Sequence, residues 1–197
     1  MFLGYDWPRL HAVVNDLPPA LLPLSVAFDL LGIYFRRESL KAAAFWTLVF
    51  GVLGTGAAIV AGLFAQDAVA HSDQAHAIME THETLAFIVL GIFGVLALWR
   101  IVRRGVWSER EQPIALTAGV IGVAILLYTA ALGGKLVFDH GLGISTGRLP
   151  AIVTERAAGH YHENDEKAAP SATVPMSAPA DTATAGAPKP PADSTKH

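Results

Sequence analysis

The sequence contains no cysteine. Disulfide bonds, thiolate metal sites, iron-sulfur clusters and covalent haem c attachment through a Cys-x-x-Cys-His motif are therefore excluded. Any redox cofactor would have to be held by histidine, methionine or carboxylate side chains.

Charge is also scarce, because Asp, Glu, Lys and Arg together make up 16% of the 197 residues and the net charge is -3 at pH 7. Such a balance provides no basic surface for nucleic acid, so a nucleic-acid partner is not expected. A secretory signal peptide is not recognisable in the N-terminal stretch MFLGYDWPRLH, which lacks a basic start and an apolar core. Any insertion into a membrane would therefore have to depend on apolar stretches elsewhere in the chain.

Apolar residues, in contrast, are abundant: they form 52% of the chain, and the mean hydropathy is +0.42. Four stretches are long enough to cross about 30 Å of hydrocarbon at ~1.5 Å per helical residue. They run from Leu17 to Phe35, from Ala42 to Phe64, from Leu85 to Val102 and from Ile114 to Val137. Because helices satisfy their own backbone hydrogen bonds in lipid, the sequence predicts an all-α bundle of four transmembrane helices.

Basic residues gather in two of the connections, RRESLK at 36–41 and RIVRRGVWSER at 100–110, whereas residues 65–84 contain no Lys or Arg. The positive-inside rule places the two basic connections in the cytoplasm and both termini on the opposite side. For a bacterial chain this means a multi-pass protein of the inner (cytoplasmic) membrane with both termini in the periplasm. All eight histidines are then predicted on the outer side.

Composition divides the chain into four parts. We expect a periplasmic N-terminal segment at 1–16, the four-helix transmembrane domain at 17–137, a partly ordered periplasmic segment at 138–167 and a disordered Ala/Pro-rich tail at 168–197. The tail has too few large apolar groups to offset the entropy of ordering it. No repeat is evident beyond a loose pattern of two hairpins.

Small residues within the spans predict close packing of helices. They are Gly54, Ala58, Gly62, Gly91, Gly94, Gly119 and Gly122. Pro18 and Pro19 suit a first helical turn capped by Asn15 or Asp16, and Pro23 should bend the first span and widen the outer half of the bundle. Asp29 lies inside this span, so its carboxylate either faces the bundle interior as a functional group or extends toward Arg36.

The stretch HSDQAHAIMETHE at 71–83 is rich in possible ligands. If it begins the third helix, Met79 and His82 share a face, while His76 points in another direction. His82 and His140 each adjoin a span, where ionisable groups tend to be functional. His71 and His76 are equally well explained as solvated groups. Lys135 could pair with a haem propionate or could simply extend to the membrane surface.

The segments HAVVNDLPPALLPLSVAFDLLG and GGKLVFDHGLGI together resemble an uncharacterised bacterial family of four-helix integral membrane domains. Members of that family open with a His-x-x-x-x-His-Phe-Pro-like motif and close with Gly-Gly-x-Leu-Val-x-x-His-Gly. The resemblance covers about residues 11–144 and implies the four-helix fold but no activity. His11 and His140 match its first and last histidines, and His82 matches the histidine at the third span, while Asp16 and Leu17 stand where the family has His and Phe.

Three functions fit these residues. The first is a haem b subunit that transfers electrons within a larger respiratory or dehydrogenase complex, with His82, His140 and His11 as candidate ligands and Lys135 beside the cofactor. The second is a non-haem copper or iron site that uses His82, His140, His11, His76 and Met79, in which the thioether favours copper(I); zinc would need Asp139 or Glu83 in addition.

The third function is a cofactor-free accessory or anchoring subunit that binds other membrane or periplasmic proteins. A stand-alone hydrolase or transferase is not expected, because the sequence shows no Ser-His-Asp order, phosphate-binding loop or paired catalytic carboxylates. We favour the haem b subunit.

Overall fold

The computed structural model describes residues 6–105, 107–144 and 147–159, and the regular structure within them is helical. The helices are α1 (Trp7–Val14), α2 (Leu17–Tyr34), α3 (Glu38–Gln66), α4 (Asp73–Val102), α5 (Gln112–Phe138) and α6 (Leu149–Ala157). The predicted tail at 168–197 lies outside the described residues. Of the predicted segment 138–167, the described part contains the nine-residue helix α6.

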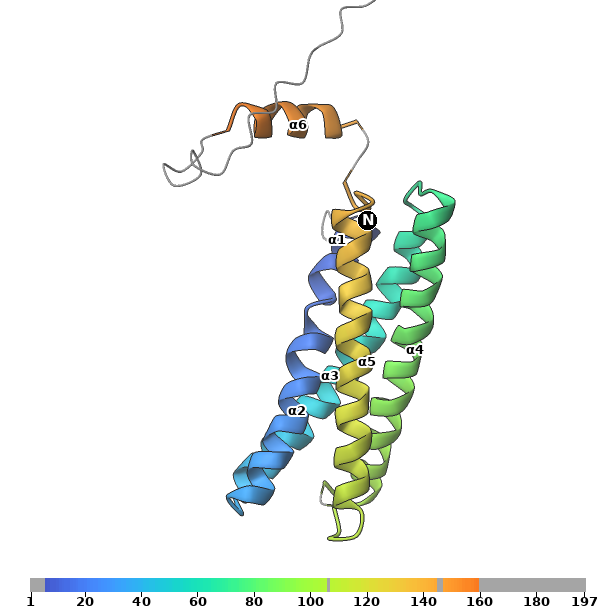
Figure 1. Ribbon diagram of the computed structural model, residues 1–197. Coiled ribbons are helices and arrows are strands. Elements are labelled where there is room, and N and C mark those ends of the chain that lie inside the picture. The colour runs from blue at the N-terminus through green and yellow to red at the C-terminus, as the bar shows by residue number, and fades with distance from the viewer. Residues whose placement is uncertain (1–5, 106, 145–146, 160–197) are drawn as a thin grey trace, which may run out of the picture. The chain divides into compact units, whose positions relative to one another are not determined.

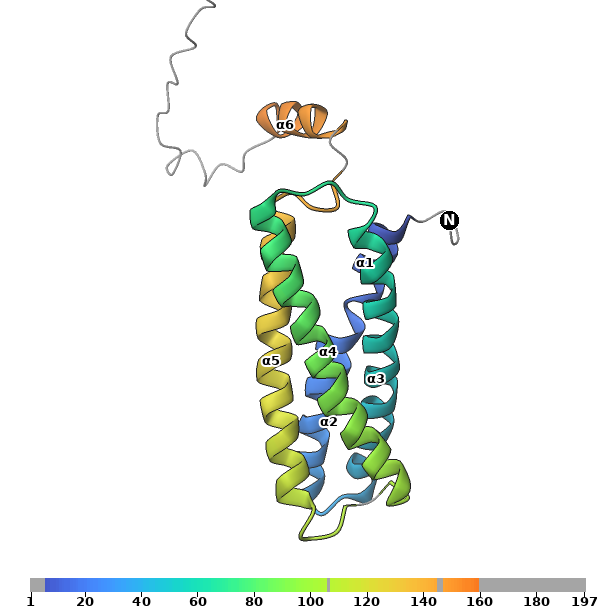
Figure 2. The same cartoon turned by 90° about the vertical axis from the view of Figure 1, so that its right-hand side faces the viewer.

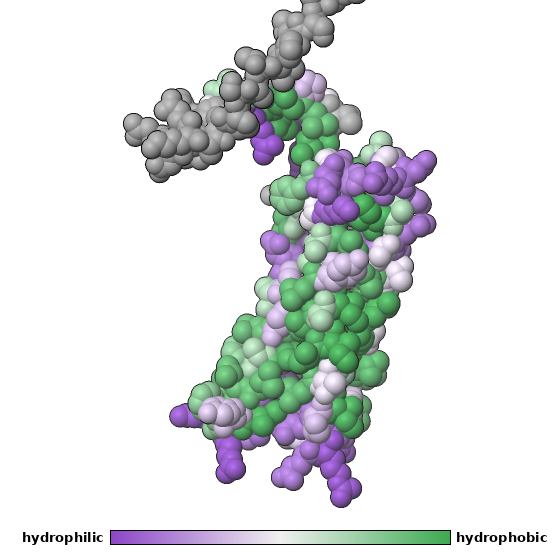
Figure 3. Space-filling view, in the orientation of Figure 1, coloured by the Kyte–Doolittle hydropathy of each residue, from purple (hydrophilic) through white to green (hydrophobic). Residues whose placement is uncertain are grey.

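Four helical segments are long and apolar enough to cross a membrane: α1 together with α2, then α3, α4 and α5. The predicted all-α bundle with four spans is thereby confirmed. On the face shown in Figure 3, apolar side chains cover the middle of the bundle and polar ones gather toward its two ends. This distribution matches a hydrocarbon layer with water on both sides.

All four spans begin earlier than their apolar stretches suggested, and the first and third differ most. α4 starts at Asp73 instead of Leu85, because the Ser72 side chain caps it by accepting the Ala75 N–H at 3.3 Å. The described part of the predicted N-terminal segment at 1–16 contains the separate helix α1, which is capped by Asp6 and precedes α2. The break between α1 and α2 falls just before Pro18 and Pro19, whose nitrogens carry no N–H.

The helices of the bundle pair as two hairpins. α3 packs along α1 and α2, α4 packs along α5, and the hairpins meet where α3 contacts α4 and α2 contacts α5 (Figures 1 and 2). The connection between α3 and α4 lies at the same end as α1, and the other two connections lie at the opposite end. Leu22, Leu48, Val89, Phe93 and Leu126 are among the buried residues of the core.

Several of the predicted small residues do permit close contacts. A Cβ at Gly54 would lie 2.8 Å from Leu17, and a Cβ at Gly122 would lie 2.7 Å from the Phe93 ring. The expectation was wrong for Gly91 and Gly94, where a Cβ would meet nothing within 4 Å. Small residues mark helix contacts only on the face that a neighbour covers, and sequence spacing alone does not identify that face.

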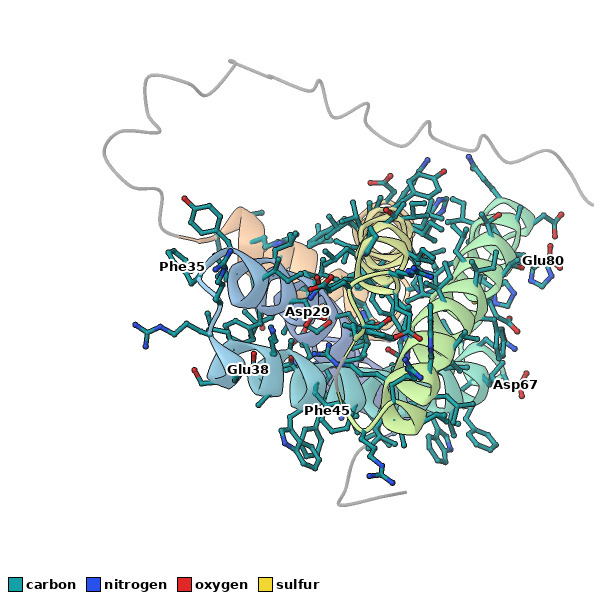
Figure 4. The ribbon with its side chains drawn as sticks, turned by 90° about the horizontal axis from the view of Figure 1, so that it is seen from below. Asp29, Phe35, Glu38, Phe45, Asp67 and Glu80 are labelled. Atoms are coloured by element: carbon teal, nitrogen blue, oxygen red, sulfur yellow. The ribbon has the colours of Figure 1, made fainter. Side chains whose placement is uncertain are left out.

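The end of the bundle with two connections is held by a buried ion pair. Arg100 is 1% exposed and donates from Nη1 to Asp29 at 2.5 Å, from Nη2 to the Lys41 carbonyl at 2.9 Å and from Nε to the Gly105 carbonyl at 3.1 Å. Seen from this end, Asp29 lies among the helices, whereas Glu38 lies at the margin (Figure 4). Asp29 thus faces the bundle interior and pairs with Arg100, not Arg36. Arg100, which was predicted to lie in the basic connection at 100–110, is instead a buried residue of α4.

We predict that Arg100→Ala lowers the free energy of unfolding by about 3–5 kcal/mol, because it leaves the Asp29 carboxylate, which is only 15% exposed, without its partner. Arg103 offers a matched control: its guanidinium is half exposed and pairs with Glu111 at 3.0 Å, so Arg103→Ala should cost about 1 kcal/mol or less. Equilibrium unfolding in detergent measures both values. Equal losses for the two variants would contradict the structural role assigned to the buried pair.

Candidate functional site

A cavity of about 530 Å³ lies between the two hairpins, toward the end of the bundle where α3 connects to α4. Helices α1 to α5 and the segment directly after α5 all contribute to its walls, which are mainly apolar. Pro18 and Pro19 are part of this lining, whereas Pro23, which was expected to widen the bundle, is not. The volume and the apolar walls with few polar groups are those of a site for a small organic ligand or cofactor.

His11 of α1 lines one side of the cavity. Its Nδ1 lies 2.8 Å from the carbonyl oxygen of Ala58 in α3. The imidazole rests on Gly62, where a Cβ would come within 3.1 Å of the ring atom Cε1. In an α-helix the carbonyl of residue 58 also bonds to the N–H of residue 62, so the absence of a side chain at Gly62 opens that carbonyl to a second donor.

His82 of α4 lines the cavity from the other hairpin and is held in the same way. Its Nδ1 lies 2.9 Å from the carbonyl oxygen of Thr129 in α5, and a Cβ at Gly133 would come within 3.2 Å of its Cε1. Gly133 therefore permits the close approach of this imidazole, as Gly62 does for His11. The ring lies nine residues into α4, about 14 Å along the helix axis.

The two hydrogen bonds fix the chemistry of the free ring nitrogens. A carbonyl oxygen can only accept, so Nδ1 of each neutral imidazole carries the proton and Nε2 keeps its lone pair. Within the described part of the chain, neither Nε2 has a hydrogen-bond partner. A histidine that donates from Nδ1 to a backbone carbonyl is oriented and made more basic as a metal ligand through Nε2. The cavity therefore offers two prepared nitrogen ligands, one from each hairpin.

Two neighbours of His82 also reach the cavity. Met79 and Glu83 line it, so the prediction that Met79 and His82 share a face is confirmed. The thioether adds a soft potential ligand, and the carboxylate adds a negative charge at the same wall.

His76 points elsewhere, as its position on the helix predicted. It is exposed, its Nδ1 lies 3.0 Å from Nε2 of His71, and its Nε2 lies 3.3 Å from the Glu80 carboxylate. Glu80 itself lies at the outer edge of the bundle in Figure 4. His71 and His76 thus interact with each other and with Glu80 on the surface, away from the cavity.

His140 and Lys135, the remaining candidates, are not among the residues that line the cavity, although Leu136, Phe138 and Leu142 are. The cation at the cavity is instead Arg9, an exposed residue two positions before His11. Sequence analysis missed Arg9 because the helix α1 that presents it has no long apolar run. Across the described ranges, no group of three or more His, Cys, Asp or Glu side chains is arranged to hold a metal ion.

Comparison with known proteins agrees with this architecture. No curated protein and no solved structure matches the chain. A family model described as predicted membrane protein (DUF2231) matches residues 8–146, which contain the four spans and every residue of the cavity. The extent agrees with the resemblance seen at about residues 11–144. The chain belongs to the DUF2231 family of predicted membrane proteins.

Proposed function

We propose that the protein binds haem b in this cavity, with His11 and His82 as the axial ligands, and serves as an electron-transfer subunit of a larger membrane complex. One observation carries the proposal: two imidazoles from opposite hairpins, both held through Nδ1 and both with an unpaired Nε2, line one apolar cavity. When bound, haem supplies a one-electron couple whose potential depends on its axial ligands and their hydrogen bonds.

The number of ligands favours a haem over a bare metal ion. A macrocycle already provides four nitrogens to iron, so two histidines complete six-coordination. A tetrahedral zinc or non-haem iron centre would need three or more protein ligands, and no such group of His, Cys, Asp or Glu exists among the described residues. The apolar walls suit the macrocycle faces and exclude water from them.

The charged edge of a haem also has a suitable neighbour. Its propionates require a cation or water, and Arg9 lies at the cavity wall with its side chain 60% exposed. Asp6 is 3.8 Å from the Arg9 Nε, so this guanidinium retains donors for another carboxylate. Arg9 takes the role that Lys135 was expected to play.

Copper(I) is the alternative that one observation favours, since Met79 lines the cavity together with His11 and His82. Two imidazoles and a thioether form a reasonable ligand set for this soft ion. Such a site would leave much of the 530 Å³ cavity unfilled, and for that reason we rank it second.

We further propose that the cavity end of the bundle faces the periplasm of a bacterial cell and that both termini lie there. The charge pattern supports this orientation, because Arg36, Arg37, Arg103 and Arg104 are exposed at the opposite end. Electrons would then be exchanged at the outer side of the inner membrane, with periplasmic or membrane subunits as partners.

Optical spectra of the detergent-purified protein test haem binding. We expect a Soret band and a sharp α band after dithionite reduction, typical of low-spin iron with two histidines. Substituting His11 or His82 with alanine should abolish the low-spin spectrum and lower the haem-to-protein ratio several-fold. Variants His76→Ala and His140→Ala serve as controls, because neither residue lines the cavity, and both should keep the wild-type spectrum.

A colourless wild-type protein that contains no iron would sink the haem proposal. Elemental analysis of the same sample then distinguishes copper from a cofactor-free subunit. If His11→Ala keeps the low-spin spectrum and His140→Ala loses it, the second haem-binding histidine is His140 at the end of α5 and not His11.

Cysteine labelling tests the orientation, and the absence of natural cysteines makes single substitutions unambiguous. Ala70 and Ser39 are both exposed, at opposite ends of the bundle. We expect Ala70→Cys to react with a membrane-impermeant maleimide in intact spheroplasts and Ser39→Cys to react only after permeabilisation. The reverse pattern would place the cavity on the cytoplasmic side.

A further inference from the structure

The two halves of the cavity are built from residues in matching register. His82, Thr129 and Gly133 each lie 71 positions after His11, Ala58 and Gly62 respectively, and each histidine bonds to a carbonyl 47 positions farther along the chain. In both halves the glycine four residues beyond that carbonyl supports the imidazole. Each half of the cavity therefore contains the same arrangement of a histidine, a backbone carbonyl and a glycine.

The same register continues through the core. A Cβ at Gly51 would collide with Leu22, and a Cβ at Gly122 would collide with Phe93, with both contacts again 71 positions apart. The following pairs at this separation are buried in both halves: Pro18 and Val89, Leu22 and Phe93, Ser25 and Leu96, Ala44 and Ala115, Leu48 and Gly119, Gly51 and Gly122, Thr55 and Leu126, Ala58 and Thr129, Ala65 and Leu136. Helix packing agrees with this register. At a separation of 71 positions α2 corresponds to α4 and α3 corresponds to α5, so the contact between α3 and α4 is equivalent to the contact between α5 and α2, and both are present.

We infer that the two hairpins are related by an internal two-fold axis and that the cavity lies on it. A residue that touches its own counterpart must lie close to such an axis, and Asp29 and Arg100, which are 71 positions apart, do so at the other end of the bundle. The axis thus runs from this ion pair to the cavity between His11 and His82.

Resting on the proposed haem function, this symmetry specifies how the ligand is held. Two-fold related imidazoles lie on opposite sides of a ligand on the axis, so they would hold a planar metal complex such as haem through two equivalent nitrogens. Gly62 and Gly133 are then equivalent positioning residues: each leaves the carbonyl four residues earlier open to its own histidine.

A methyl group at either glycine tests this equivalence. With Cβ only 3.1 Å or 3.2 Å from the imidazole, Gly62→Ala or Gly133→Ala should displace the ring and lengthen its Nδ1 hydrogen bond. A weaker hydrogen bond makes the imidazole a poorer donor to ferric iron, so the midpoint potential should rise. Gly94→Ala is the matched control, because a Cβ there meets nothing within 4 Å.

The experiment is a redox titration of the full-length haem protein, with EPR spectra of the ferric state. We expect upward shifts of similar size for Gly62→Ala and Gly133→Ala, an approximately additive shift in the double variant, changed g-anisotropy in all three and no change in the control. A shift at one glycine only, or shifts of opposite sign, would overturn the equivalence even though haem is bound.

Two further measurements keep the inference testable. If the alanine variants do not fold, the variants His11→Gly and His82→Gly are measured with free imidazole added to replace the missing side chain. If the two sites are equivalent, the imidazole concentrations that restore the low-spin spectrum in the two variants should agree within about threefold. If the wild-type protein contains no haem, the proposed function and the ligand assignment fail together. The two-fold relation is then tested by thermal unfolding. Unequal decreases in the midpoint temperature for Gly62→Ala and Gly133→Ala would contradict it.

Discussion

A hydrocarbon solvent offers no hydrogen bonds, and this constraint determines most of what the structure shows. It requires the backbone to be helical, and it requires each polar side chain within the bundle to find a partner there. Arg100 meets the requirement with three acceptors from three separate segments, and the two cavity histidines meet it with helix carbonyls. The hydrogen bonds that offset the cost of placing these polar groups within the bundle also fix the orientation of the side chains. The same interactions therefore stabilise the fold and orient the two cavity histidines.

The two ends of the bundle use that constraint differently. At the Arg100 end each guanidinium nitrogen donates a hydrogen bond, and two aromatic rings lie near the guanidinium, with Trp107 at 5.4 Å and Phe45 at 6.0 Å. At the cavity end prolines and glycines keep the helices from filling the space between them, and one nitrogen of each imidazole stays free. The protein thus combines a closed, structural end with an open end suited to binding.

Sequence analysis predicted the four spans well because hydropathy measures the lipid-facing surface directly, yet it misjudged the ends. α4 extends to Asp73 because Ser72 caps a polar helical segment that carries no hydropathy signal. Among the candidate ligands, His82 and Met79 followed from helical periodicity, which is a local property. The pairing of His11 with His82 did not follow, since it depends on how two hairpins pack. The partners of Asp29 were missed for the same reason, and so was the repeat, because the hairpins share register and burial but few identical residues.

The ion pair between Asp29 and Arg100 distinguishes this single chain from a dimer of two identical hairpins. In a dimer of two identical hairpins, the position on the axis would bring two copies of one residue together, so like charges would meet there. Opposite charges at that position require two different sequences in the two halves. With both hairpins in one chain, each half can carry its own residue at this position. A salt bridge that no symmetric dimer could form now holds together a site that remains symmetric at its other end.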